Sequence, residues 1–128
     1  MADEKLVTRI KKVGAKQAVE EWKSAGKKID LSGADLKGVY LQEVNFQWAD
    51  LRGADLEEAD FRGAYLLGVN FSGANLAGTN FCGVDLSAAT FSGAYLEGSN
   101  FRGADLRGAD LSGAYLHNAQ GVPKEMRK

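Results

Sequence analysis

Residues 71–106 read FSGANLAGTNFCGVDLSAATFSGAYLEGSNFRGADL, and a Leu or Phe stands at every fifth position of this stretch. The same spacing extends in both directions, from Leu31 to Leu116, and gives eighteen positions without an exception. We refer to these positions as the centres: Leu31, Leu36, Leu41, Phe46, Leu51, Leu56, Phe61, Leu66, Phe71, Leu76, Phe81, Leu86, Phe91, Leu96, Phe101, Leu106, Leu111 and Leu116. An internal repeat of this regularity determines how every other residue is interpreted.

The repeat has a period of five, which fits neither the 3.6-residue period of a helix nor the two-residue period of a strand. Each unit must therefore combine a short extended piece with a turn. The residue two before the centre is small or β-branched in every unit, and it is Ala in eleven of them. Residues two apart on an extended chain point to the same side. We therefore expect the centres and these small residues to face the interior.

The residue two after the centre is Gly in thirteen of the eighteen units. A type II turn needs a positive φ at its second central residue, and glycine adopts that conformation without steric cost. The pattern therefore predicts mostly type II turns. Five units depart from it, at Glu43, Trp48, Glu58, Ala88 and Asn118. We expect distorted or different turns at the first four, whereas Asn tolerates left-handed dihedrals.

Four turns of about 90° each bring the chain back over itself every twenty residues, so the pattern predicts an all-β solenoid with square coils. Successive coils should stack at the strand spacing of about 4.8 Å. Eighteen pentapeptides then make about four and a half coils.

The tandem units, such as ANLAG, VDLSA and ADLRG, resemble the pentapeptide repeat family over residues 29–118. This resemblance implies a right-handed quadrilateral β-helix, often with a helix before the first repeat. Many members, abundant in cyanobacteria, have no known activity. The quinolone-resistance members are rod-shaped acidic mimics of duplex DNA that bind DNA gyrase.

Residues 1–28 and residues 119–128 lie outside the repeat and form the two ends of the predicted coil. Apolar spacing predicts a helix over residues 3–26 that breaks or bends at Gly14. We interpret residues 1–28 as an N-terminal helical cap with Trp22 as its largest anchor. The alternative is a basic amphipathic helix for a membrane or a partner. The tail, 119–128, either folds over the last coil or leaves its edge open for dimerisation.

Composition excludes most enzyme chemistry. The chain of 128 residues has one Cys and one His, which rules out an internal disulfide and the usual metal-ligand sets. No glycine-rich phosphate loop or nucleophile elbow occurs. We therefore expect no catalytic residues, cofactor, metal or small-molecule substrate. The absence of a long apolar run predicts a cytoplasmic protein without a membrane segment.

The charge is unevenly distributed along the sequence. Residues 29–118 carry twelve acids and five bases, whereas residues 1–28 carry four acids and eight bases. The acidic coil disfavours direct nucleic-acid binding, and flat solenoid walls suit protein contact better than small substrates. We therefore predict a non-enzymatic interaction scaffold or spacer that is a monomer or a dimer through its C-terminal end. The alternative is a DNA-mimicking inhibitor of gyrase or topoisomerase.

Outward positions supply the candidate site residues. Tyr95 and Tyr115 are twenty residues apart, so they should be adjacent in the stack and form a contact patch with His117. His117 should also stand over Glu97 as a surface pair. Cys82 should project outward between two arginines, either as a reactive thiol or as an ordinary variable residue.

Overall fold

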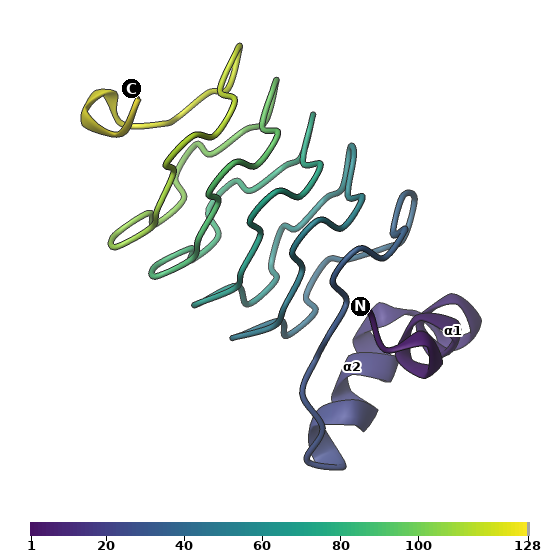
Figure 1. The fold of residues 1–128 in the computed structure, drawn as a ribbon. Coiled ribbons are helices and arrows are strands. Elements are labelled where there is room, and N and C mark those ends of the chain that lie inside the picture. The colour runs from purple at the N-terminus through teal and green to yellow at the C-terminus, as the bar shows by residue number, and fades with distance from the viewer. Residues whose placement is uncertain (128) are drawn as a thin grey trace.

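A computed structural model describes residues 1–127 of the chain, and it shows a stack of similar coils. Residues twenty apart pair as isolated parallel bridges, for example Asp30 with Asp50, Asn70 with Thr90 and Tyr95 with Tyr115. Figure 1 shows helices α1 and α2 at one end of the stack and the carboxyl-terminal segment at the other. The twenty-residue pairing follows from four five-residue units in each turn of the coil.

Each five-residue unit closes with a β-turn. The N–H of the small residue after the turn donates to the carbonyl of the preceding centre, as from Ala54 to Leu51 at 3.2 Å. The thirteen turn glycines have φ between 66° and 76°. A negative φ followed by a positive φ is the combination that defines a type II turn. The glycine pattern is therefore a direct consequence of turn geometry.

The sequence predicted distorted or different turns at Glu43, Trp48, Glu58 and Ala88, and this prediction is wrong. Glu43, Trp48, Glu58 and Ala88 have φ between 60° and 65°, and Asn118 has 62°. Each of the four also donates its backbone N–H to the next coil, as Trp48 does to Leu67 at 2.9 Å. The neighbouring coil therefore holds these residues in the glycine conformation, at a cost of roughly 1 kcal/mol or more each.

The polar residue before each centre has a structural role. In all thirteen units with Asp or Asn at this position, the side-chain Oδ1 accepts the backbone N–H two residues later. This is the Asx-turn, in which the side chain stabilises the backbone turn that follows. Much of the acidity of the coil therefore serves its own turns.

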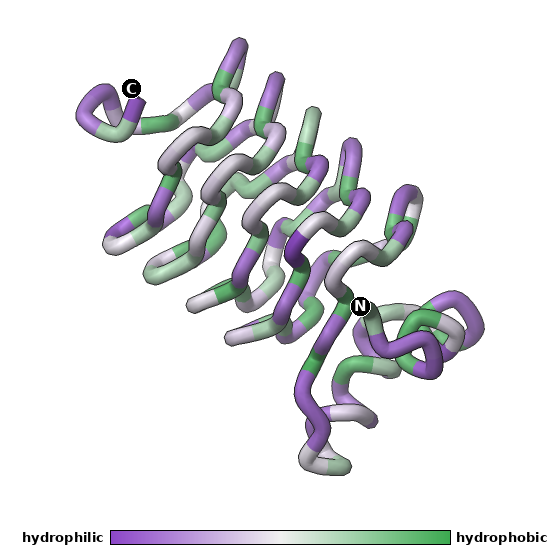
Figure 2. Tube along the Cα trace, viewed as in Figure 1, coloured by the Kyte–Doolittle hydropathy of each residue, from purple (hydrophilic) through white to green (hydrophobic). Residues whose placement is uncertain are grey.

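The core runs along the axis of the coil. Seventeen of the eighteen centres are buried, and the last one, Leu116, is partly buried. Phe rings stack along the axis, with centroids 5.1 Å apart for Phe61 and Phe81 and 5.0 Å apart for Phe81 and Phe101. Figure 2 shows hydrophobic and hydrophilic residues alternating at short intervals along the coils. The alternation places one set of side chains inside and the other outside.

The amino-terminal segment forms two helices, α1 (Glu4–Val13) and α2 (Ala15–Ser24), which meet at Gly14 with a φ of 96°. Asp3 caps the first helix by accepting the N–H groups of Lys5 and Leu6. The 3-10 helix η1 (Lys124–Met126) follows the last unit. The chain thus begins and ends with helical segments of very different size.

The buried face of α1 and α2 belongs to the same apolar cluster as the coil interior. Leu6 and Ile10 are one helical turn apart and are 0% and 2% exposed, and Val19 on α2 is fully buried. Trp22 is only partly buried. The backbone N–H of Asp3 donates to the carbonyl of Asp30 at 2.9 Å, which joins the start of the helical segment to the first coil.

Candidate functional site

Tyr95 and Tyr115 form a stacked aromatic pair on one wall of the coil. Their ring centroids are 4.9 Å apart and their planes differ by 3°. The side chains are brought together by the parallel bridge between these two residues, and they are 46% and 52% exposed. A preformed, half-exposed aromatic pair is the kind of surface that protein interfaces favour.

His117 is exposed and lies two residues beyond Tyr115. Residues two apart on an extended chain point to the same side, so both side chains point away from the core. The carbonyl of His117 accepts the N–H of Gly98 at 2.9 Å, which fixes its backbone in the stack. Within residues 1–127 no ion pair joins His117 to Glu97. The structure therefore leaves His117 exposed on the coil surface without the expected pairing to Glu97.

Cys82 is a free, half-buried thiol. Its backbone N–H donates to Asn80 Oδ1 at 3.0 Å, as in the other Asx-turns. The guanidinium of Arg62, which the sequence places one coil away, makes a two-pronged contact with Asp60. Cys82 therefore occupies a turn with the same Asx hydrogen bond as its neighbours, and its use as a reactive thiol stays a prediction.

Arginines neutralise several carboxylates of the coil. Arg52, Arg62 and Arg107 each pair with the Asp two residues earlier, at 2.7, 2.6 and 2.6 Å. The hydrogen bond from Arg62, with further donation from Gln42, lowers the pKa of Asp60 to about 2. These pairs reduce the negative potential that the sequence count alone suggests.

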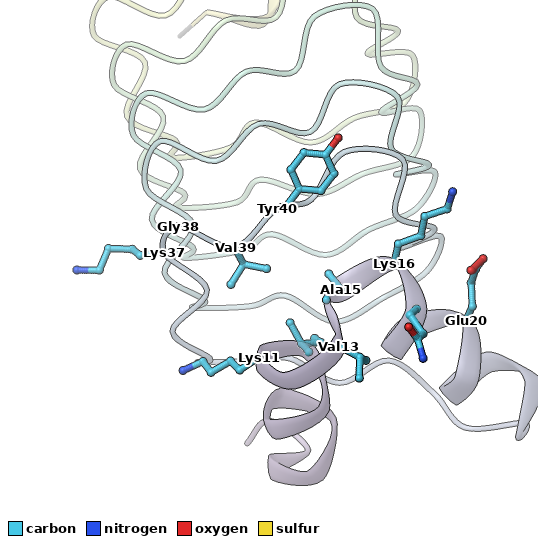
Figure 3. Close-up of a pocket in the computed structure, with 12 residues that line it drawn as sticks. Lys11, Val13, Ala15, Lys16, Glu20, Lys37, Gly38, Val39 and Tyr40 are labelled. Carbon is cyan, nitrogen blue, oxygen red and sulfur yellow. The ribbon is translucent and has the colours of Figure 1, made fainter.

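A groove lies where α1 meets α2 beside the first coil (Figure 3). It has a volume of about 880 Å³, and Val39 and Tyr40 line it from the coil. Tyr40 is 68% exposed. Two lysines of the groove are paired with the chain's own acids, Lys16 with Glu43 at 3.5 Å and Lys37 with Asp55 at 3.6 Å. The sequence did not predict this groove, because no local pattern fixes how the helices sit on the coil.

Residues 1–127 contain no group of three or more His, Cys, Asp or Glu side chains placed to hold a metal ion. None of the helices there is long and apolar enough to cross a membrane.

The stacked coils, with side chains filling the interior and flat outer walls, define a β-helix solenoid built from five-residue units. A family model described as pentapeptide repeats (8 copies) matches residues 29–66, 64–103 and 89–120. The chain therefore belongs to the pentapeptide repeat family, and the resemblance drawn from its sequence is confirmed. The family fold is a right-handed β-helix.

Solved structures give the same class. The chain is 31% identical to HetL, a pentapeptide repeat protein involved in heterocyst differentiation regulation in the cyanobacterium Nostoc sp. strain PCC 7120, with a TM-score of 0.57. The match covers 73% of this chain but 52% of HetL, so the chain spans about half the length of that protein. This likeness supports the solenoid fold.

Two further structures are less similar in shape. A pentapeptide repeat protein of the Arabidopsis thaliana thylakoid lumen is 29% identical, with 77% of this chain and 71% of that chain covered and a TM-score of 0.47. QnrB1, a plasmid-mediated fluoroquinolone resistance protein, is 30% identical, with coverages of 66% and 58% and a TM-score of 0.33. No curated protein matches the chain.

Proposed function

We propose that this chain is a non-enzymatic scaffold that binds a partner protein through the wall carrying Tyr95, Tyr115 and His117. The observation that carries the proposal is the stacked tyrosine pair, with centroids 4.9 Å apart and both rings about half exposed. Stacking fixes both rings before a partner arrives, so little side-chain entropy is lost on binding. We further propose that the protein acts in the cytoplasm.

The scaffold has three parts in this proposal. Residues 29–118 form a rod of about four and a half coils, and residues 1–28 cap its first coil, with Trp22 among the anchors. The burial of Leu6, Ile10 and Val19 supports the cap. Residues 119–128 form a tail, in which Val122 and Met126 pack partly against the core.

The carboxyl-terminal end offers a second surface, for dimerisation. Within residues 1–127 the backbone N–H groups of Leu106, Leu111 and Leu116 donate no backbone hydrogen bond. Unpaired backbone groups at the edge of a parallel ladder can pair with another chain. The proposal therefore allows either a monomer or a dimer joined at this end.

Mimicry of duplex DNA towards gyrase or topoisomerase is the less favoured alternative. The carboxylates of Asp50, Asp60 and Asp105 are paired with arginines of their own turns. A mimic would need carboxylates free to replace phosphates on a basic protein surface. A gyrase supercoiling assay distinguishes the two, because a scaffold of this kind leaves the reaction unaffected.

The scaffold proposal is tested by pull-down from the native cell extract. The intact protein is compared with the triple variant Tyr95→Ala, Tyr115→Ala and His117→Ala. Tyr65→Ala serves as the matched control, because Tyr65 is also exposed, at 56%, but belongs to a different wall. We expect a protein that the intact chain and the control retain and the triple variant loses. Equal retention by all three, or no retained protein, contradicts the proposal.

A further inference from the structure

Trp48 is an unusual turn residue in this coil. It occupies a position where thirteen of eighteen units have glycine, and its φ is 62°. Its side chain is nonetheless 69% exposed, the highest value among the aromatic residues. The large side chain gains little burial in return for a backbone conformation that favours glycine.

The indole of Trp48 is held in place by the next coil. A Cβ atom built on Gly68, which is twenty residues further on, would overlap Cε3, Cζ3 and Cδ2 of Trp48. The six-membered ring therefore lies directly over the glycine backbone. One side of the indole rests on the coil, and the large exposed fraction leaves the rest of the ring open to solvent.

A hollow of about 540 Å³ lies between Trp48 and the end of α2. It is lined by Lys23, Gly26, Lys27, Lys28, Ile29, Gln47 and Trp48. Three of these seven residues are lysines, and none is acidic. The hollow thus joins an open aromatic ring to a positively charged rim.

In the part of the chain that the structure describes, the lysines of this rim have no acidic partners in ion pairs, unlike Lys16 and Lys37 of the groove in Figure 3. Within residues 1–127 no ion pair includes Lys23, Lys27 or Lys28. Lys23 Nζ donates to the neutral Asn45 Oδ1 at 3.1 Å, and Lys27 Nζ lies 4.8 Å from the ring of Trp22.

The carboxylate of Asp3 lies near this rim. The hydrogen bond from Trp22 Nε1, and to a smaller extent the charge of Lys27, keeps the pKa of Asp3 below its usual value. The residues that line the hollow include three lysines and no acid, so its rim is positive. In the groove of Figure 3, by contrast, two of the three lysines have acids of the chain within 4 Å.

We propose that this hollow binds an acidic, flexible segment of a partner protein, with an apolar side chain against Trp48 and carboxylates against Lys27 and Lys28. Tryptophan is enriched among the residues that dominate binding energy, and opposite charge at the rim gives specificity. The inference rests on the proposed scaffold function, and it adds a second surface and the chemistry of its partner. An extended polyanion is a poorer fit, because the coil beyond Trp48 is net acidic.

The decisive variant is Trp48→Gly, which restores the residue found in thirteen equivalent turns. It removes the aromatic ring while keeping a residue suited to a φ of 62°. The fold should therefore persist, which the far-UV circular dichroism spectrum and the midpoint of thermal unfolding check. Lys27→Glu with Lys28→Glu reverses the charge of the rim. Lys5→Glu with Lys12→Glu makes the same charge change at exposed positions of α1, outside the hollow.

The full chain is used to select binders from a display library of random dodecapeptides, and selected peptides are then titrated by fluorescence anisotropy. We expect selected sequences that combine Asp or Glu with an apolar residue. Their affinity should fall at least about tenfold for Trp48→Gly and for the Lys27 and Lys28 variant, and stay unchanged for the α1 control. No enrichment, enrichment of basic or uncharged peptides, or unchanged affinity of Trp48→Gly overturns the inference.

Two other probes distinguish other anionic partners. Vesicles of phosphatidylserine and phosphatidylcholine, and an oligodeoxythymidine, are titrated against the intact chain and Trp48→Gly. Tighter Trp48-dependent binding of either probe than of the peptides also overturns the inference. If the pull-down captures a protein through Tyr95 and Tyr115 while no acidic peptide is selected, only this inference fails and the scaffold proposal stands.

Discussion

The two ends of the coil are built from the same repeat but are covered very differently. At the amino-terminal end, Leu31 is fully buried, and apolar side chains of α1 and α2 join its cluster. At the carboxyl-terminal end, Leu116 is only partly buried, and Arg127 donates to the carbonyls of Leu116 and Ala119. A solenoid needs protection where its repeat stops. The repeat alone therefore does not supply that protection, and the segments outside it determine how well each end is covered.

Removing the helical segment should have the largest effect. Deleting residues 1–28 exposes the apolar face and the unpaired backbone of the first coil, so we expect aggregation by end-to-end stacking. Deleting residues 121–128 should leave a well-behaved protein, because the tail covers its end only partly. Size-exclusion chromatography with light scattering compares the two. A stable monomer after the first deletion would show that α1 and α2 are not a cap.

The same substitution at the two ends should give different losses of stability. Leu31→Ala should lower the free energy of unfolding by about 2–5 kcal/mol, because its site is fully enclosed. Leu116→Ala should cost about 1 kcal/mol, since part of its side chain is already exposed. Urea unfolding measures both, with Leu76→Ala as the reference for the middle of the coil. Equal losses at Leu31 and Leu116 would mean that the ends are equally protected.

Substitutions of two turn glycines, Gly68 and Gly73, should lower the stability by different amounts. Gly68 and Gly73 have φ of 69° and 68°, so Ala at either position should cost about 1 kcal/mol through backbone strain. Gly68→Ala should cost more, because its Cβ meets the ring of Trp48, whereas nothing lies within 4 Å of the Cβ at Gly73. In the Trp48→Gly background the two costs should become similar. A difference that persists there would refute the contact.

The smallest expected effect is on the pH dependence of stability, and it comes from an ion pair on the wall of the coil between its two ends. Arg62, assisted by Gln42, lowers the pKa of Asp60 to about 2. Because this folded-state pKa lies below the unfolded value of about 3.9, the ionised form stabilises the fold above about pH 4. That contribution is lost as the pH falls towards 2, and solvent exposure limits it to about 1 kcal/mol or less.

Asp60→Asn should therefore flatten the acid side of the stability profile, measured by urea unfolding at a series of pH values. Asn retains the Oδ1 acceptor of the Asx-turn, so the turn itself should persist. Glu20→Gln is the control, because Glu20 is exposed and makes no ion pair within residues 1–127. A profile of Asp60→Asn that matches the wild type would refute the role of the Arg62 pair.

The sequence predicts most of the coil because its pattern is local. A five-residue period with Gly two after the centre leaves few arrangements, and the stacking of Tyr95 on Tyr115 follows from their twenty-residue separation. The turn at Trp48 could not be predicted from propensity, because its φ is imposed by the hydrogen bond to Leu67 in the next coil.

Features that depend on how the helices pack on the coil also could not be predicted from the sequence. The groove at Tyr40 and the lysine rim around Trp48 both lie between the helical segment and the first coil. In each, residues of the helical segment, which has no five-residue period, meet residues of the coil. The count of Asp residues suggested an acidic wall, whereas the structure gives their Oδ1 atoms to backbone turns and several of their charges to arginines.

Native-state hydrogen exchange tests the difference between the two ends most directly. It compares hydrogen-bonded amides of the first coil, the middle and the last coil: Leu31 to Asp50 O at 2.8 Å, Leu76 to Tyr95 O at 2.8 Å and Tyr115 to Ala94 O at 2.9 Å. We predict that Leu31 exchanges as slowly as Leu76, through global unfolding, and that Tyr115 exchanges faster, through local opening of the partly covered carboxyl-terminal end. Faster exchange at Leu31 than at Tyr115 would contradict the claim that the helices protect the amino-terminal end.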